Sequence, residues 1–205
     1  MKTINLLLTL LVLAFMVACG GGETQQQETT EMTESESQTE QADTMAQDIR
    51  TIEIIGIDAM KFAVESDIEG ITVGGQAGSQ QNLLLLETIE AQPGEQIRIR
   101  LTTRSQLPAT AMAHNWILMV QGADAAAYAN KAVQAKDQDY LPPDLSDQVL
   151  FHTELVAGGE TTELTFTAPS EPGDYEYICS FPGHYTAGMK GFLTVTEESA
   201  EMETE

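Results

Sequence analysis

The segment 179–191, CSFPGHYTAGMKG, places a thiol, an imidazole and a thioether within eleven residues. Four residues separate Cys179 from His184, and four separate His184 from Met189. The proline and glycines between them favour tight turns, so the segment predicts a loop. A strand-like stretch, GDYEYICSF, leads into it and another, GFLTVTE, follows it. A folded loop between two strands can bring all three side chains to one point.

Most of the surrounding sequence has the composition of short β-strands. The strand-like segments are 51–57, 83–91, 95–103, 149–156, 161–168, 173–181 and 191–197. The segment 95–103, EQIRIRLTT, alternates apolar and polar residues with period two. Gln92–Glu95 (QPGE) predicts a turn, and Ala157–Glu160 (AGGE) predicts a hairpin between the segments 149–156 and 161–168. Six or more short strands separated by turns indicate an all-β sandwich or barrel.

One helix is expected to interrupt the strands. The run 125–135 is rich in alanine, and Asp124 before it is a suitable N-cap.

The N-terminal residues predict an exported lipoprotein. A positive start and a short apolar run indicate a signal peptide over 1–18. The sequence MVAC before three glycines resembles a bacterial lipoprotein processing site, which makes Cys19 the acylated lipid anchor. The alternative is an ordinary signal peptide that happens to end beside a cysteine. We expect a membrane-anchored chain that faces the periplasm or the cell exterior.

Three regions follow the signal peptide. Residues 19–48, beginning with the acylated Cys19, are rich in Glu, Gln, Thr and Ser and bury too little apolar surface to fold, so they predict a disordered acidic tether. Residues 49–196 number 148, a suitable length for one domain. Residues 197–205 form an acidic tail.

The charge of the folded part is less extreme than the −23 of the whole chain. Tether and tail hold 13 of the 32 acidic residues, which leaves 19 acidic and 8 basic residues in 49–196, about −11. This balance excludes nucleic acid as a partner, because binding to phosphate needs Lys and Arg. It would speed association with a basic protein, although a merely solvated acidic surface explains it equally well.

Cys179 needs an explanation because it has no disulfide partner in the chain once Cys19 is acylated. The domain contains three histidines: His184, His152 and His114, which lies in the sequence AHNW. In a Greek-key sandwich, distant segments can meet at one end of the sheets, so His114 can complete a site with the loop.

Two imidazoles, a thiolate and a more distant thioether are the ligands of a blue-copper electron-transfer centre. The soft sulfur ligands favour Cu(I), whereas imidazole suits both oxidation states. Cysteine with two histidines also suits zinc, but a thioether is a poor zinc ligand, so Met189 favours copper.

Four segments resemble the azurin and auracyanin family of cupredoxins, in the same order along the chain. They are IGIDAMKF (55–62), AHNW (113–116), DYLPPDLSDQVLFHT (139–153) and CSFPGHYTAGMKGFLTV (179–195). The resemblance implies the cupredoxin fold, a Greek-key β-sandwich, here with one short inserted helix. It also implies one copper ion per chain.

The resemblance assigns the ligands. It implies that His114, Cys179 and His184 form a trigonal plane around copper, with Met189 as the weak axial ligand. The backbone carbonyl of Ala113, where azurin has glycine, would be a further weak axial contact.

The resemblance also assigns neighbouring residues. Asn115 would tie the two ligand segments together, and the backbone amides of Asn115 and Phe181 would donate to the Cys179 sulfur. Trp116 matches a buried core tryptophan, and His152 matches a surface histidine that is not a ligand.

Three features differ from azurin. No cysteines are present to form azurin's structural disulfide, and the step from His184 to Met189 is one residue longer, as in auracyanin. The stretch 64–82 is a glycine-rich insertion that we expect to form a surface loop.

These observations predict an electron carrier that acts on no small molecule and is not an enzyme. A copper nitrite reductase would need further histidines for a second copper site, and the three in this chain do not suffice. The electron would pass through an exposed edge of His184 to redox proteins such as a c-type cytochrome or a terminal oxidase. The residues expected to form the docking patch are Met60, Met112, Phe181, Pro182 and Tyr185. The alternative is a copper or zinc binding or delivery protein without a redox role.

Overall fold

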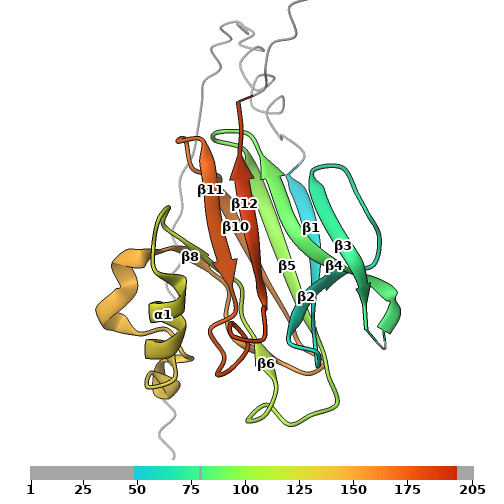
Figure 1. The fold of residues 1–205 in the computed structure, drawn as a ribbon, viewed down its shortest axis with the longest axis vertical. Helices are drawn as coiled ribbons and strands as arrows, with labels where there is room; N and C mark the ends of the chain where they lie inside the picture. Colours follow the sequence, from blue (N-terminus) through green and yellow to red (C-terminus); the bar gives the residue numbers. More distant parts are fainter. Residues whose placement is uncertain (1–48, 79, 198–205) are drawn as a thin grey trace, which may run out of the picture. The chain divides into compact units, whose positions relative to one another are not determined.

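Twelve β-strands form the framework of the residues that the computed structural model describes, 49–78 and 80–197 (Figure 1). The strands are β1 (Arg50–Ile57), β2 (Lys61–Val64), β3 (Ile71–Ala77), β4 (Gln80–Ala91), β5 (Gln96–Arg104), β6 (Ala113–His114), β7 (Ile117–Met119), β8 (Val149–His152), β9 (Val156–Ala157), β10 (Thr161–Thr167), β11 (Gly173–Ile178) and β12 (Lys190–Val195). The predicted signal peptide, Cys19, most of the tether and most of the acidic tail lie outside the described residues.

Ten strands are joined by hydrogen bonds in the order β10-β5-β1-β2-β4-β12-β11-β7-β8, with β3 paired to β4. The short strands β6 and β9 pair separately. The pairs β1–β5 and β4–β12 are parallel, and the other strand pairs are antiparallel. One buried cluster takes side chains from β1, β5 and β10 and also from β4, β11 and β12, so the core lies between two layers. The expected all-β sandwich is confirmed.

Strand β5 shows why the sequence forms this sandwich. Ile97, Ile99 and Leu101 are buried, whereas the arginines between them point outward. Successive side chains of a strand point to opposite faces, so the period of two in the sequence becomes one apolar and one polar face. Trp116 is also buried, with its ring centroid 5.5 Å from that of Tyr177, which agrees with the expected packing role.

The predicted hairpin between 149–156 and 161–168 is wrong. Strand β8 pairs with β7, and β10 pairs with β5 along its whole length. The turn at Ala157–Glu160 does form, with the Glu160 N–H donating to the Ala157 carbonyl at 3.0 Å. It joins β9, which pairs with β6, to β10.

The expected surface loop at 64–82 is also wrong in part. Strand β3 lies within it and pairs antiparallel with β4, with irregularities in the register. Ala77 and Leu83 pack in a second buried cluster with Ile55, Ile57 and Ala63. The inserted segment contributes Ala77 to this cluster, and the other members come from β1, β2 and β4.

The expected helix is confirmed as α1 (Ala125–Ala132), which is shorter than the predicted 125–135. The Asp124 carboxylate caps it by accepting from the Ala127 N–H at 2.9 Å. Two short 3-10 helices that the sequence did not indicate, Lys136–Gln138 and Pro143–Gln148, follow it. Within residues 49–78 and 80–197, no helix is long and apolar enough to cross a membrane.

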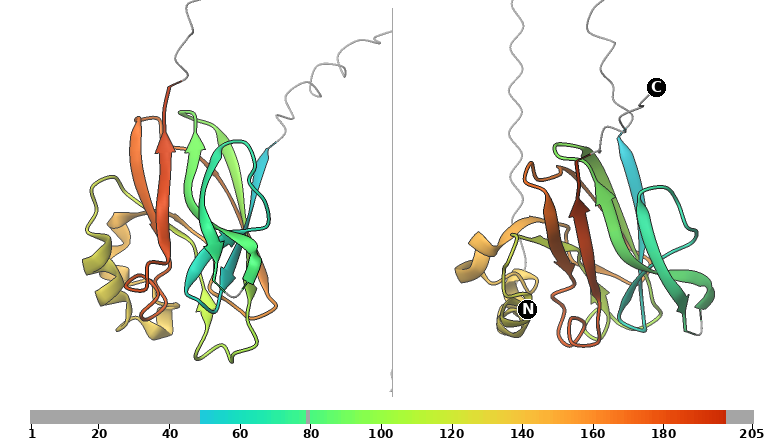
Figure 2. Two further views of the ribbon diagram at one scale, coloured as in Figure 1. Left: turned by 45° about the vertical axis from the view of Figure 1, so that its right-hand side comes forward. Right: turned by 45° about the horizontal axis from the view of Figure 1, so that its top comes forward.

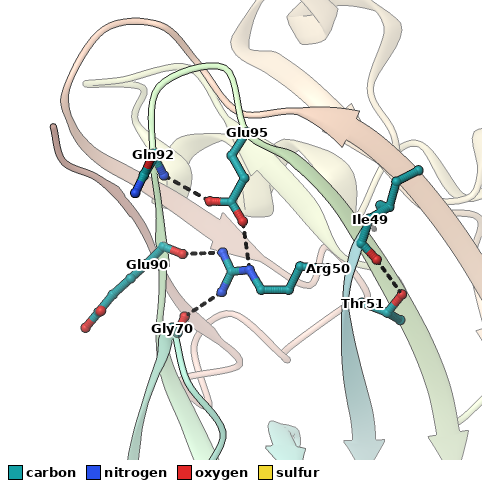
Figure 3. Close-up of polar contacts among 7 residues, drawn as sticks. All are labelled: Ile49, Arg50, Thr51, Gly70, Glu90, Gln92 and Glu95. Atoms are coloured by element: carbon teal, nitrogen blue, oxygen red, sulfur yellow. Dashed lines mark hydrogen bonds and ion pairs between the residues drawn. The ribbon is translucent and has the colours of Figure 1, made fainter. Parts of the chain in front are cut away.

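Arg50, at the start of β1, forms hydrogen bonds to three other segments of the chain (Figure 3). Its guanidinium donates to the Glu95 carboxylate at 2.8 Å and to the carbonyls of Gly70 and Glu90. Glu95 also accepts from the Gln92 N–H at 3.0 Å, within the predicted turn, which is confirmed. The start of β1 and the end of β12 lie at this end of the sandwich, and the loop between β11 and β12 lies at the opposite end (Figures 1 and 2).

We predict that the second cluster contributes to stability. Leu83→Ala should lower the free energy of unfolding by about 2–5 kcal/mol, because the side chain is 0% exposed and its removal leaves a cavity. Leu107→Ala, at a residue 45% exposed, should change it by less than about 0.5 kcal/mol. Chemical denaturation of both variants measures this, and equal effects would contradict a structural role for the second cluster.

Candidate metal centre

Three donor side chains from two distant segments meet at the end of the sandwich. His114 lies in β6, whereas Cys179 and His184 lie in the loop between β11 and β12. The Cys179 Sγ lies 3.4 Å from His184 Nδ1 and 4.0 Å from His114 Nδ1. The donor atoms lie within 4.8 Å of one another, and their side chains are 0%, 0% and 1% exposed for His114, Cys179 and His184.

These separations fit a common metal ion. The bond lengths for zinc are about 2.3 Å to sulfur and about 2.0 Å to nitrogen. They place a sulfur and a nitrogen bound to the same ion about 3.5–3.7 Å apart. The measured sulfur–nitrogen distances lie on either side of that range. The sulfur also faces the Nδ1 atom of each ring, so both nitrogens are directed at the same place.

Burial changes the ionisation of all three groups. It lowers the pKa of His114 to about 3, with a further contribution from His184, and lowers the pKa of His184 to about 4. Burial raises the pKa of the Cys179 thiol to about 12, although backbone hydrogen bonds from Asn115 and Phe181 oppose this. Without metal the site therefore holds neutral imidazoles and a protonated thiol at pH 7.

Strand pairing and a glycine position His114. Strand β6 pairs with β9, where His114 lies opposite Val156. A Cβ atom at Gly56 in β1 would overlap the His114 ring, so only glycine lets β1 approach the imidazole this closely. The sequence signal for this contact is the isolated glycine within the strand-like segment 51–57.

Asn115 links the two ligand segments. Its side-chain amide donates to Ser180 Oγ at 2.9 Å, and its oxygen accepts from the Ser180 N–H at 2.9 Å. Both residues are buried, so these bonds replace those lost to water. The resemblance indicated the role of Asn115, but no signal in the sequence identified Ser180 as its partner.

The loop between β11 and β12, called the ligand loop below, contains a single helical turn with a defined end. The Ala187 N–H donates to the Gly183 carbonyl at 3.0 Å, as in an α-helix. Gly188, with φ of 87°, then donates to the Tyr185 carbonyl, and the Met189 N–H donates to the His184 carbonyl. This pair of bonds is the Schellman motif, which brings the first and last residues of the pair, His184 and Met189, close together.

Met189 and Ala113 lie beside the three donors. Met189 is 0% exposed, and its carbonyl accepts from the Cys179 N–H at 3.1 Å. Ala113 is buried next to His114 and pairs with Ala157. The axial roles expected for the Met189 sulfur and the Ala113 carbonyl remain predictions.

The expected exposed edge of His184 is wrong. The ring packs against Phe181, with centroids 4.8 Å apart, and against His114, with centroids 4.9 Å apart. Phe181 and Met112, which we placed in the docking patch, are buried, whereas Met60, Pro182 and Tyr185 are partly exposed. His152 is exposed and lies outside the donor cluster, as expected.

Known copper proteins are similar to this chain in sequence. Auracyanin-B of Chloroflexus aurantiacus is 49% identical over 84 residues, which are 40% of this chain and 35% of that protein. Auracyanin-A of the same organism is 42% identical over 104 residues, which are 50% of this chain and 60% of that protein. Azurin of Pseudomonas aeruginosa is 36% identical over 103 residues, which are 49% of this chain and 68% of azurin. The matches therefore span only part of the two auracyanins.

A solved structure agrees with the sequence matches. Auracyanin A, described as a "blue" copper protein, superposes with a TM-score of 0.53 and 33% identity, covering 71% of this chain and 98% of that one. This similarity shows the expected cupredoxin fold. Residues 73–196 also match the copper binding proteins of the plastocyanin/azurin family. Since this match covers more than half of the sequence, the chain belongs to the plastocyanin/azurin family of copper binding proteins.

Proposed function

We propose that the domain carries single electrons through one copper ion held by His114, Cys179, His184 and Met189. The observation that carries this proposal is the buried cluster of one thiol and two imidazoles. Met189, directly before β12, is also buried. Copper in such a donor set exchanges one electron between Cu(I) and Cu(II).

The protein contributes burial and a fixed donor geometry. All four side chains are at most 1% exposed, which leaves them inaccessible to water and to a small-molecule substrate. The hydrogen bonds of Asn115 and the turn at Gly188 hold the donors before any metal binds. Backbone amides of Asn115 and Phe181 would spread the negative charge of the Cys179 thiolate. A rigid, buried site needs little rearrangement when one electron moves.

We further propose that the partners are redox proteins such as a c-type cytochrome or a terminal oxidase. Support comes from the burial of His184 behind Phe181, because an electron can cross one layer of side chains whereas a substrate cannot. Tyr185, directly after His184, is partly exposed and belongs to the docking surface in this proposal. The acidic balance of the domain would favour a basic partner.

We also propose that the chain is exported and anchored by a lipid on Cys19, facing the periplasm or the cell exterior. Support comes from the signal-like residues 1–18 and the sequence MVAC. The domain begins at the end of the sandwich opposite the ligand loop, so an anchor there would leave the metal centre accessible (Figures 1 and 2).

The absorption spectrum of the copper-loaded protein tests electron carriage. We expect an intense blue band that disappears on reduction, returns on oxidation and follows a one-electron titration with one copper per chain. Cys179→Ser should lack the band, because the band needs a copper–thiolate bond. A colourless protein that takes up zinc instead would overturn the proposal in favour of a binding role without redox chemistry.

Metal uptake should release about one proton at pH 7.5. The Cys179 thiol, with its pKa near 12, must lose a proton to bind, whereas the two imidazoles are already neutral. The apparent affinity should therefore rise about tenfold per pH unit between pH 6 and 9. Calorimetry with Cu(II) in buffers of different ionisation enthalpy measures the proton count. Cys179→Ser should release none, and a count of two or more in the unaltered protein would contradict the assigned charges.

Lipid attachment can be tested in bacteria that are fed a labelled fatty acid. The full chain should carry the label and fractionate with membranes, and Cys19→Ala should lose both properties. Cys179→Ser is the matched control and should keep both, because its cysteine is buried in the folded domain. Label retained by the Cys19 variant would contradict acylation at this residue.

A further inference from the structure

Lys61, which is distant in the sequence, contacts the ligand loop. It begins β2 and pairs with Ile57, the last residue of β1. Its ammonium donates a hydrogen bond to the Ala187 carbonyl, 126 residues later. Ala187 lies between two of the proposed ligands, His184 and Met189.

This contact occupies the end of the helical turn. The last carbonyls of a helix lack intrahelical donors, and a lysine side chain can satisfy them. The Schellman bonds use the carbonyls of His184 and Tyr185, and Lys61 supplies the donor for Ala187. A Cβ atom at Gly188 would lie 2.5 Å from Lys61 Nζ. The glycine thus permits both the left-handed turn and the close approach of the ammonium.

Among the described residues, no carboxylate forms an ion pair with the Lys61 ammonium. The ion pairs there involve five other basic residues, namely Arg50, Arg100, Arg104, Lys131 and Lys190. A positive charge beside the loop disfavours the more positive oxidation state of a metal held there. It therefore favours the reduced state.

We propose that Lys61 is a positioning residue for the metal centre. Its ammonium holds the Ala187–Gly188 peptide, which fixes Met189 relative to His184, and its charge raises the reduction potential. This inference rests on the copper centre proposed above.

The test compares Lys61→Met with the unaltered protein in two measurements. The first is the ratio of reduced to oxidised copper protein at a fixed potential, which should fall on the order of fivefold when the charge is removed. That change corresponds to about 40 mV at 59 mV per tenfold. The second is amide hydrogen exchange of Gly188 and Met189 in the metal-free protein, which should become about fivefold faster when the hydrogen bond is lost.

Two variants serve as controls. Lys61→Arg keeps the charge and a donor, so it should restore both properties toward those of the unaltered protein. Arg98→Met removes one positive charge at a site farther from the metal centre. Arg98 pairs with Thr51, which lies five residues along β1 from Gly56, the residue that contacts the His114 ring. This separation is about 16 Å along the strand, so the potential should change little. If Lys61→Met does not fold, Lys61→Gln also removes the charge and must lower the potential.

The outcomes separate this inference from the proposed function. A blue protein whose potential and amide exchange are unchanged by Lys61→Met overturns the role of Lys61 and leaves electron carriage intact. An equal fall in Arg98→Met overturns the local effect of the charge. Absence of the blue band in the unaltered protein overturns both proposals.

Discussion

Two backbone hydrogen bonds at the end of one helical turn determine where the metal ligands lie. They run from Gly188 to Tyr185 and from Met189 to His184, and they require the left-handed conformation that glycine adopts at little cost. This motif is frequently accompanied by a contact between two apolar side chains at the helix end. Here the same two positions carry an imidazole and a thioether. The spacing of four residues between them thus follows from the geometry of the turn.

The sandwich makes this turn useful by burying it. Neutral imidazoles and a protonated thiol are buried together, which costs free energy that the rest of the fold must offset. The paired bonds between Asn115 and Ser180 hold the two ligand segments without relying on the metal. A metal that binds here gains from donors that are already in place, because little conformational entropy remains to be lost.

Local patterns in the sequence predicted much of this structure. Alternation predicted β5, Asp124 predicted the start of α1, and the chemistry of the loop predicted which donors would meet. Pairing between distant strands was harder, because a turn signal such as Ala157–Glu160 shows where the chain reverses but not which strands become neighbours. The burial of His184 and the contact of Lys61 depend on side chains from other segments, so no local pattern reports them.

The positions of the two described chain ends also matter for handling the protein. Both lie at the end of the sandwich fastened by Arg50, and the ligand loop lies at the other end (Figures 1 and 3). A linker, an affinity tag or an electrode surface attached through either end would therefore orient every molecule with its ligand loop outward. The same domain joined at its N-terminus to a redox enzyme would present the loop to solution instead of to its fusion partner.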